Sequence, residues 1–526
     1  MRSVSRWRFG SPETRAAVEA WLSGALPGVE LRDNPRRRIV RLDLGAGHAL
    51  VLKLFRTASG RHAMRERWKA RVGLSPAARE ARALREASRG GAPVAEALGL
   101  ARLDDGDVLL ALRLVGGMPL SEALRRAPRE RRQLLRSLGR AMADLHRAGL
   151  AHGDLHHGNV LVADDRPILL DLQHARALTR ERALRDAGFL EHSLRPLVSA
   201  PDRVRVLRAA LGLSPRPTPR DRASLRGVLA AGDARAREHA RSRTRRALRP
   251  GRAYAALAHG AERGLRVREL PEDVVLEALR RHRAVQGGGG AEGARVLTGD
   301  GRSRVSAVRV GSDALVVKEV LPRGGLRPLA DLVRGSPGRR AWRAGHGLLF
   351  RGIGAARPLA YLERRRLGLP IASVVLLEDL SADRPADRAA LEAPDDFPPA
   401  HVVETLGRVA IALHRQGVLH DDLKASHVLL RATPRGLEAR LIDLEGLRLD
   451  AALSETARLR ALAQLNASLP DALPAAARHR AFLRYARALP FAAGEARALR
   501  RVVQQSLARQ HRWSGAGCAL APRARR

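Results

Sequence analysis

Hydrophobic and polar positions recur in two similar blocks along the chain. In the first half, residues 39–44 and 49–55 are apolar stretches on either side of a glycine-containing turn, which predicts two paired β-strands. In the second half, residues 305–310 and 314–320 repeat the arrangement around another glycine-containing turn. Both halves are thus expected to open on a β-rich region.

The similarity continues beyond these strands. A Ser-Pro pair precedes a helical pattern in each half, at Ser75 and at Ser336. Further on, AHGDLHHGNVLV and PILLDLQHARAL in the first half match LHDDLKASHVLL and ARLIDLEGLRL in the second. Because these features recur in the same order at nearly the same spacing, the sequence predicts a tandem duplication of one domain of about 250 residues.

Domain limits follow from the positions of the two copies. The run Gly287 to Gly290 is the best linker candidate, so we expect a first domain at residues 1–286, a linker at 287–292 and a second domain at 293–526. The segment 234–252 is strongly basic. An arginine-rich surface helix of the first copy and a binding patch are both compatible with it.

The basic composition says less about function than the net charge of +42 suggests. The chain has 526 residues with 96 Lys and Arg, yet Lys occurs only at positions 53, 69, 318 and 424. Such an arginine bias is expected from a GC-rich coding sequence, and with 3% aromatic residues and no recognition motif it does not predict nucleic-acid binding. The single cysteine, Cys518, excludes an intramolecular disulfide and fits a reducing compartment.

The residues that carry chemistry point to phosphoryl transfer. This reaction needs a cation for the nucleotide phosphates, an anion to orient it, a carboxylate to align the hydroxyl, and oxygen ligands for Mg²⁺. The first copy offers Lys53, Glu80 and Asp154 for the first three roles and Asn159 with Asp171 for the metal. The second copy offers Lys318, Asp422, His427 and Asp443 in the corresponding places. We therefore expect ATP and Mg²⁺ as cofactors.

These motifs resemble the lipopolysaccharide core (Kdo and heptose) kinase family of the protein-kinase-like superfamily. HGDLHHGNVLV with DLQHARAL is also similar to the neighbouring aminoglycoside phosphotransferases. The second copy resembles the family more narrowly, because its members often have His where other kinases have the metal-binding Asn, as at His427. The resemblance covers most of both halves and implies an α+β fold of two tandem bilobal domains, each with a small β-rich N-lobe and a helical C-lobe.

Three departures weaken the second copy. Ala341 stands where the first copy has Glu80, so Lys318 is expected to lack a carboxylate partner. His427 offers an imidazole nitrogen, which is a poorer Mg²⁺ ligand than an amide oxygen. Neither copy has a clear glycine-rich phosphate loop, the nearest being Gly299-Asp300-Gly301. The first copy is therefore the better candidate for catalysis, and the second is an active relative or a degenerate regulatory copy.

The leading hypothesis is an ATP-dependent kinase for a sugar hydroxyl of a lipopolysaccharide-core-like glycolipid. The alternatives are a small-molecule phosphotransferase of the aminoglycoside or choline type and a pseudokinase scaffold. Four arginines after Asp171, at positions 176, 180, 182 and 185, favour an anionic acceptor over a cationic one. No apolar segment long enough for a signal or membrane span is present. We expect a cytoplasmic protein, with peripheral contact at the anionic face of the inner membrane left open.

Overall fold

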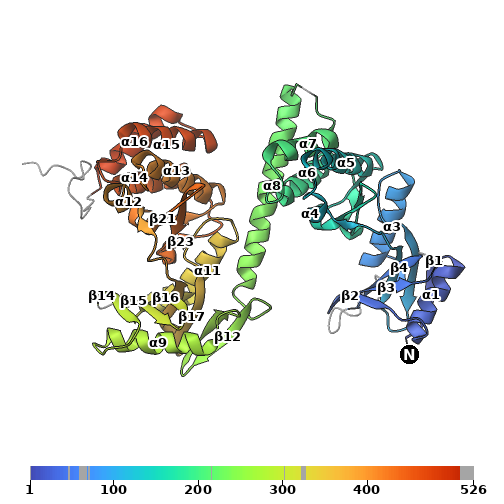
Figure 1. Cartoon of the computed structure of the whole chain (residues 1–526), viewed down its shortest axis with the longest axis horizontal. Helices are drawn as coiled ribbons and strands as arrows, with labels where there is room; N and C mark the ends of the chain where they lie inside the picture. The colour runs from blue at the N-terminus through green and yellow to red at the C-terminus, as the bar shows by residue number, and fades with distance from the viewer. Residues whose placement is uncertain are drawn as a thin grey trace, which may run out of the picture. The chain divides into compact units, whose positions relative to one another are not determined.

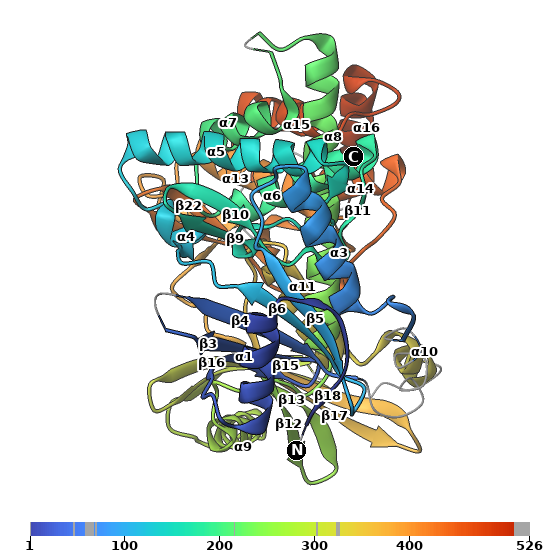
Figure 2. The same ribbon diagram turned by 90° about the vertical axis from the view of Figure 1, so that its right-hand side faces the viewer.

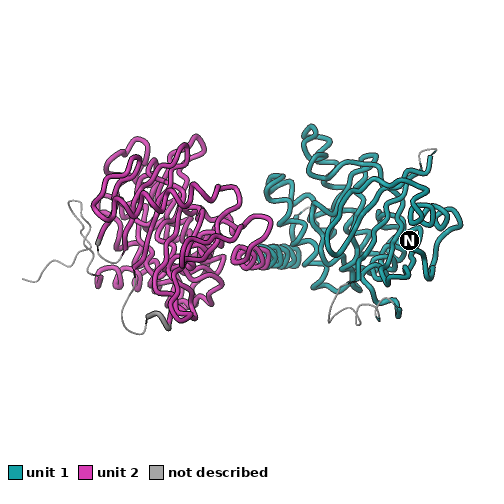
Figure 3. The backbone as a smooth tube through the Cα atoms, turned by 90° about the horizontal axis from the view of Figure 1, so that it is seen from below, with its two compact units in different colours: residues 1–236 teal, residues 237–526 magenta. Residues whose placement is uncertain are grey.

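The computed structural model describes residues 2–45, 48–57, 68, 71–214, 216–300, 303–321 and 327–509. Cys518 and Gly301 lie outside these residues. The chain divides into two compact units, Met1–Ala236 and Arg237–Arg526, which Figure 3 shows in two colours. Each unit is described by itself.

The first unit begins with an antiparallel sheet. Its strands are β1 (Val4–Gly10), β2 (Val29–Asn34), β3 (Arg37–Asp43), β4 (Ala49–Phe55), β5 (Ala97–Leu103) and β6 (Val108–Arg113). Their order in space is β1-β5-β6-β4-β3-β2, so that β4 is an interior strand paired with both β3 and β6. Helix α1 (Pro12–Ser23) follows β1, and helix α3 (Pro76–Arg89) packs on β4, β5 and β6 (Figure 2).

The second lobe of this unit is mainly helical. Its helices are α4 (Leu120–Ala123), α5 (Pro128–Arg147), α6 (Arg180–Leu194), α7 (Ala200–Leu211) and α8 (Pro219–Arg246). Between α5 and α6 lie the short strands β8 (Leu150–Ala151), β9 (Val160–Ala163), β10 (Arg166–Leu169) and β11 (Arg176–Ala177), while β7 (Met118–Pro119) pairs with β9. Leucines along one face of α5, including Leu135, Leu138 and Leu145, are buried and hold the lobe together. Helix α8 begins in the first unit and ends in the second.

The second unit repeats this architecture (Figure 1). Its sheet strands are β12 (Tyr254–His259), β13 (Glu262–Val267), β14 (Ala294–Asp300), β15 (Ser303–Val310), β16 (Asp313–Val320), β17 (Pro358–Arg366) and β18 (Leu369–Glu378), in the spatial order β12-β13-β17-β18-β16-β15-β14. The helices of its sheet lobe are α9 (Glu272–Gln286), α10 (Arg327–Arg334) and α11 (Pro337–Leu349). Strand β16, which carries Lys318, is interior like β4.

The helical lobe of the second unit also follows the first. Its helices are α12 (Ala386–Glu392), α13 (Pro399–Arg415), α14 (Glu455–Ala467), α15 (Ala475–Ala488) and α16 (Glu495–Leu507), and its short strands are β19 (Arg384–Pro385), β20 (Leu419–His420), β21 (Val428–Thr433), β22 (Gly436–Leu441) and β23 (Leu447–Arg448). The expected fold of two bilobal, kinase-like domains is therefore confirmed. Among the described residues, no helix has the length and apolar character needed to cross a bilayer.

The second copy starts earlier than the glycine run suggested. Residues 254–286 were expected in the first domain, but β13 pairs with β17 of the second unit, from Glu262 opposite Arg364 to Arg266 opposite Ala360. This pairing buries Leu265 and places the strand within the second sheet. The first unit has the same extension, since β1 pairs with β5 and α1 follows it. Residues 287–290 therefore connect two elements of one unit, α9 and β14, and do not separate the domains.

Candidate active site

The side chains of Lys53 and Glu80 form a buried ion pair in the first unit. Lys53 lies on the interior strand β4, and its Nζ is 2.5 Å from Oε1 of Glu80 on α3. Ser75 caps the start of α3 by accepting a hydrogen bond from the Ala78 amide. The alanine-rich face of that helix packs inward and carries Glu80, which is fully buried, to the lysine. Oε2 of Glu80 has no partner among the described residues. Within those residues, the only hydrogen bond of the Glu80 carboxylate is therefore the one that Oε1 accepts from Lys53.

The loop from His152 to Asn159 presents Asp154. The side-chain NH₂ group of Asn159 donates to the main-chain oxygen of Asp154 at 3.0 Å, which leaves the side-chain oxygen of Asn159 for another partner. His152 is fully buried, and its Nε2 lies 3.0 Å from the main-chain oxygen of Leu170, next to Asp171. Burial lowers the pKa of His152, so the imidazole is a neutral structural link between two segments of the site.

Asp186 on α6 anchors this loop, and the sequence patterns did not single it out. Its carboxylate accepts from the backbone amides of His152 at 2.7 Å and Gly153 at 2.9 Å, and it lies 3.1 Å from Nε2 of His146. Asp186 is buried. The only sequence signal was an acidic residue beside the apolar run that follows it on α6, which by itself does not identify a partner.

Asp171 combines a left-handed backbone with a carboxylate oxygen that lacks a partner in the described part of the chain. It has a left-handed conformation with φ of 61°, and its buried Oδ1 has no hydrogen-bond partner among the described residues. Its Oδ2 lies 3.4 Å from one terminal nitrogen of the Arg37 guanidinium, and the other terminal nitrogen donates to the side-chain oxygen of Gln173 at 2.6 Å. A free carboxylate oxygen and an amide oxygen from Asn159 suit Mg²⁺, which favours oxygen ligands and usually shares substrate phosphates. The described residues contain no cluster of three or more acidic, His or Cys side chains that could hold a metal unaided.

The turn between the first unit's strands β2 and β3 contains arginine and is not glycine-rich. Strand β2 runs to Asn34, and the turn to β3 consists of Pro35 and Arg36. The side chain of Asn34 closes it by accepting from the amides of Arg36 and Arg37. The turn therefore directs Arg37 from β3 toward Asp171, a contact that no sequence motif indicated.

The second unit replaces the Lys–Glu pair with a different one. Ala341 is buried on α11 as expected, but Lys318 does not lack a carboxylate: its Nζ lies 2.8 Å from Glu445 and 2.9 Å from Asp443. Burial by itself works to lower the pKa of Lys318, and the carboxylates of Glu445 and Asp443 outweigh it, so the pKa is raised. Likewise, burial works to raise the pKa of Asp443, and Lys318 turns the net shift downward. The signal for Glu445 was in the sequence, two residues after Asp443.

The loop around Asp422 keeps the geometry of the first unit with different side chains. His427 lies 2.9 Å from the main-chain oxygen of Asp422, the contact that Asn159 makes in the first unit. The carboxylate of Asp422 is engaged on both oxygens, by Lys424 at 2.9 Å and by Gln464 on α14. Free metal-binding oxygens are therefore fewer here than in the first unit.

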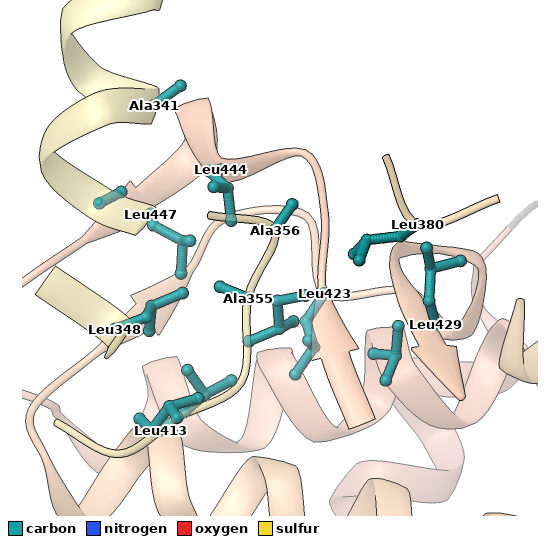
Figure 4. Packing of buried hydrophobic residues seen from close by; sticks show 14 of the residues in the cluster. Ala341, Leu348, Ala355, Ala356, Leu380, Leu413, Leu423, Leu429, Leu444 and Leu447 are labelled. Atoms are coloured by element: carbon teal, nitrogen blue, oxygen red, sulfur yellow. The ribbon is translucent and has the colours of Figure 1, made fainter. Parts of the chain in front are cut away.

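The anchor of the second loop is also different. Helices α6 and α14 begin after the caps Thr179 and Ser454, and counting from these caps places Ala461 where the first unit has Asp186. The Asp421 amide instead donates to the main-chain oxygen of Gly446. Figure 4 shows Leu423 and Leu444, which follow Asp422 and Asp443, among the buried side chains that hold both segments in the core.

The family follows from a match over both units. The model of the lipopolysaccharide kinase (Kdo/WaaP) family matches residues 29–198 and 337–485. The chain belongs to this family. The matched segments contain Lys53, Asp154 and Asp171 in the first unit, and Asp422 and Asp443 in the second.

Individual relatives match shorter parts of the chain. The KEOPS complex subunit Bud32 of Pyrococcus abyssi is 32% identical over 94 residues, which is 18% of this chain and 41% of Bud32. The serine/threonine-protein kinase PknE of Mycobacterium tuberculosis is 37% identical over 83 residues, 15% of either chain. The match thus spans less than half the length of these curated relatives. The solved structure of WaaP in complex with acyl carrier protein covers 44% of this chain and 98% of its own, with 22% identity and a TM-score of 0.33.

Two histidines beside Asp154 belong to the loop and to no metal cluster in the described ranges. His156 accepts from the Gly158 amide, and its Nε2 is 4.0 Å from Asp154. The His157 amide donates to Ser193 on α6. In the second unit the Ala425 amide likewise donates a hydrogen bond to the Ser468 hydroxyl. This part of the loop is therefore held in the same way in both copies.

Proposed function

We propose that the chain is an ATP- and Mg²⁺-dependent phosphotransferase whose first unit transfers the γ-phosphoryl group to an alcohol. One observation carries this proposal: the buried Lys53–Glu80 pair occurs in the same unit as Asp154, Asn159 and the Asp171 oxygen that has no hydrogen-bond partner among the described residues. Membership of the lipopolysaccharide kinase family supports it.

Each residue has a defined task in the proposed reaction. Lys53, oriented by Glu80, binds the α and β phosphates of ATP. Asp154 aligns the acceptor hydroxyl and takes its proton as the new oxygen–phosphorus bond forms and the bond to the β-phosphate oxygen breaks, so that ADP leaves. Asn159 and Asp171 are the residues that would hold Mg²⁺, which when bound neutralises negative charge on the phosphates.

The acceptor we propose is an anionic sugar, such as a hydroxyl of a lipopolysaccharide-core-like glycolipid. Four exposed arginines follow Asp171 on β11 and at the start of α6, at positions 176, 180, 182 and 185. Such a cluster attracts phosphorylated or carboxylated sugars and repels cationic acceptors. It also suits contact with the anionic face of the inner membrane, where a glycolipid acceptor lies.

We further propose that the second unit contributes little to this transfer. Lys318 is engaged by Asp443 and Glu445, and both carboxylate oxygens of Asp422 have partners. Before the second unit could bind a nucleotide, Lys318 and Asp422 would have to give up these contacts. A site preformed for nucleotide binding would not need this rearrangement.

The test uses the full chain with ³²P-labelled ATP, Mg²⁺ and core oligosaccharide acceptors. Wild type is expected to label the saccharide, Asp154→Ala to lose transfer by at least a hundredfold, and Asp422→Ala to retain it. Unlabelled saccharide with wild type would refute the proposed acceptor class. Equal losses in the two variants would refute the assignment of catalysis to the first unit.

A further inference from the structure

Helix α8 brings an arginine onto the proposed catalytic carboxylate. A guanidinium nitrogen of Arg235 lies 2.5 Å from Oδ1 of Asp154. The same guanidinium stacks on the ring of Phe189 on α6, with its carbon 4.6 Å from the ring centroid. Side-chain exposures of 20% for Arg235 and 28% for Asp154 show that the pair is sheltered but open to a ligand. Arg235 lies outside the segments that match the family model.

The second unit provides an internal comparison. Counting from the caps of α6 and α14, Phe189 corresponds to Gln464, which contacts the loop aspartate directly. Two residues after that aspartate the second unit has Lys424, paired with Asp422 at 2.9 Å. The first unit has His156 there, 4.0 Å from Asp154 and beyond hydrogen-bonding distance. Each loop aspartate therefore contacts a cationic side chain, and in the first unit that side chain comes from α8.

We infer that Arg235 is a catalytic residue of the first unit that binds the transferred phosphoryl group. Phe189 and Asp154 hold its planar guanidinium at the place where the acceptor hydroxyl meets the γ-phosphorus. Arginine presents several N–H donors in one plane, which match the equatorial oxygens of that group.

The chemical step makes use of this position. The acceptor oxygen bonds to the γ-phosphorus, the bond to the β-phosphate oxygen breaks, the hydroxyl proton passes to Asp154, and ADP departs. As the carboxylate accepts the proton, its attraction for Arg235 weakens, and the guanidinium N–H groups become available to the oxygens of the transferring phosphoryl. An arginine supplied within the same chain at this point accelerates other phosphoryl transfers by about 10³-fold or more. The inference rests on the proposed function of the first unit.

The experiment measures binding of a transition-state mimic, so it needs no acceptor. The full chain carries Lys318→Met to remove nucleotide binding by the second unit. Dissociation constants for Mg·ADP alone and for Mg·ADP with aluminium fluoride are compared by calorimetry in this parent and in Arg235→Ala and Arg235→Lys. The matched control is Arg226→Ala, an exposed arginine on the same helix.

Arg235→Ala is expected to leave the Mg·ADP constant within twofold of the parent and to remove at least a hundredfold of the tightening by aluminium fluoride. Arg235→Lys should recover part of it, and Arg226→Ala all of it. Tightening that survives in Arg235→Ala overturns the inference. Equal weakening of both complexes also overturns it, because Arg235 would then act on ground-state binding alone. A parent chain that binds no Mg·ADP removes the proposed function of the first unit, and this inference with it.

Discussion

The Lys53–Glu80 pair allows a quantitative test of the first unit. Glu80 is fully buried and Lys53 nearly so, with 2.5 Å between the charged groups. Glu80→Ala leaves the ammonium in the interior without its carboxylate, and breaking a buried pair in this way costs about 3–5 kcal/mol. Replacing both partners, as Lys53→Met with Glu80→Leu, removes both charges and should restore most of that stability.

Hydrogen exchange measures the loss of stability caused by Glu80→Ala in the first unit itself. Since about 1.4 kcal/mol corresponds to a factor of ten, Glu80→Ala should speed exchange of the β4 amides by roughly two to three and a half orders of magnitude. The corresponding strand β16 of the second unit serves as the internal reference. The double variant should regain protection of β4 without regaining nucleotide binding. The reasoning is refuted if Glu80→Ala changes exchange by less than tenfold, or if the double variant is no more protected than the single one.

Three further results are expected. Burial lowers the pKa of His346 to about 3 and of His414 and His420 to about 4. Below a pH of about 6.5 the unfolded chain therefore binds up to three protons that these histidines exclude in the folded unit. The free energy of unfolding from urea titrations should be constant above that pH and fall by up to about 4 kcal/mol per pH unit toward pH 4. Asp186→Asn, which weakens two amide contacts of the loop, should lower kcat at least tenfold with little change in thermal stability, and an unchanged kcat would contradict the anchoring role. Gly153→Ala should lower transfer as well, because φ is 80° and a Cβ would lie 2.4 Å from the His174 oxygen; wild-type kinetics would show that the loop relaxes freely.

The sequence was a good guide where chemistry and local pattern coincide. Lys53, Asp154 and Asp171 stand in motifs whose spacing follows from strands and short loops, and the structure places them in one unit. Glu80 could be selected because a capped helix fixes which face turns inward. Glu445 stands two residues after Asp443, and it supplies Lys318 with the carboxylate that the helix position of Ala341 lacks.

Other contacts depend on tertiary distances that no local pattern encodes. Arg235 is 81 residues from Asp154 in the chain and reaches it only through the path of α8. Asp186 acts on backbone amides, which carry no side-chain signature. The start of the second copy was misplaced because a glycine run signals flexibility, whereas strand pairing, which decides membership of a sheet, depends on residues nearly a hundred positions away.

The pairing of β13 with β17 decides where the chain can be divided. A fragment that begins after the glycine run would lose β12, β13 and α9, leaving the edge of β17 with unpaired amides and carbonyls and an apolar surface uncovered. Open strand edges of this kind recruit other chains, so such a fragment would aggregate whatever the state of its catalytic residues. Inactivity of an isolated half cut at that point would report on a damaged sheet and would say nothing about the chemistry of the second copy.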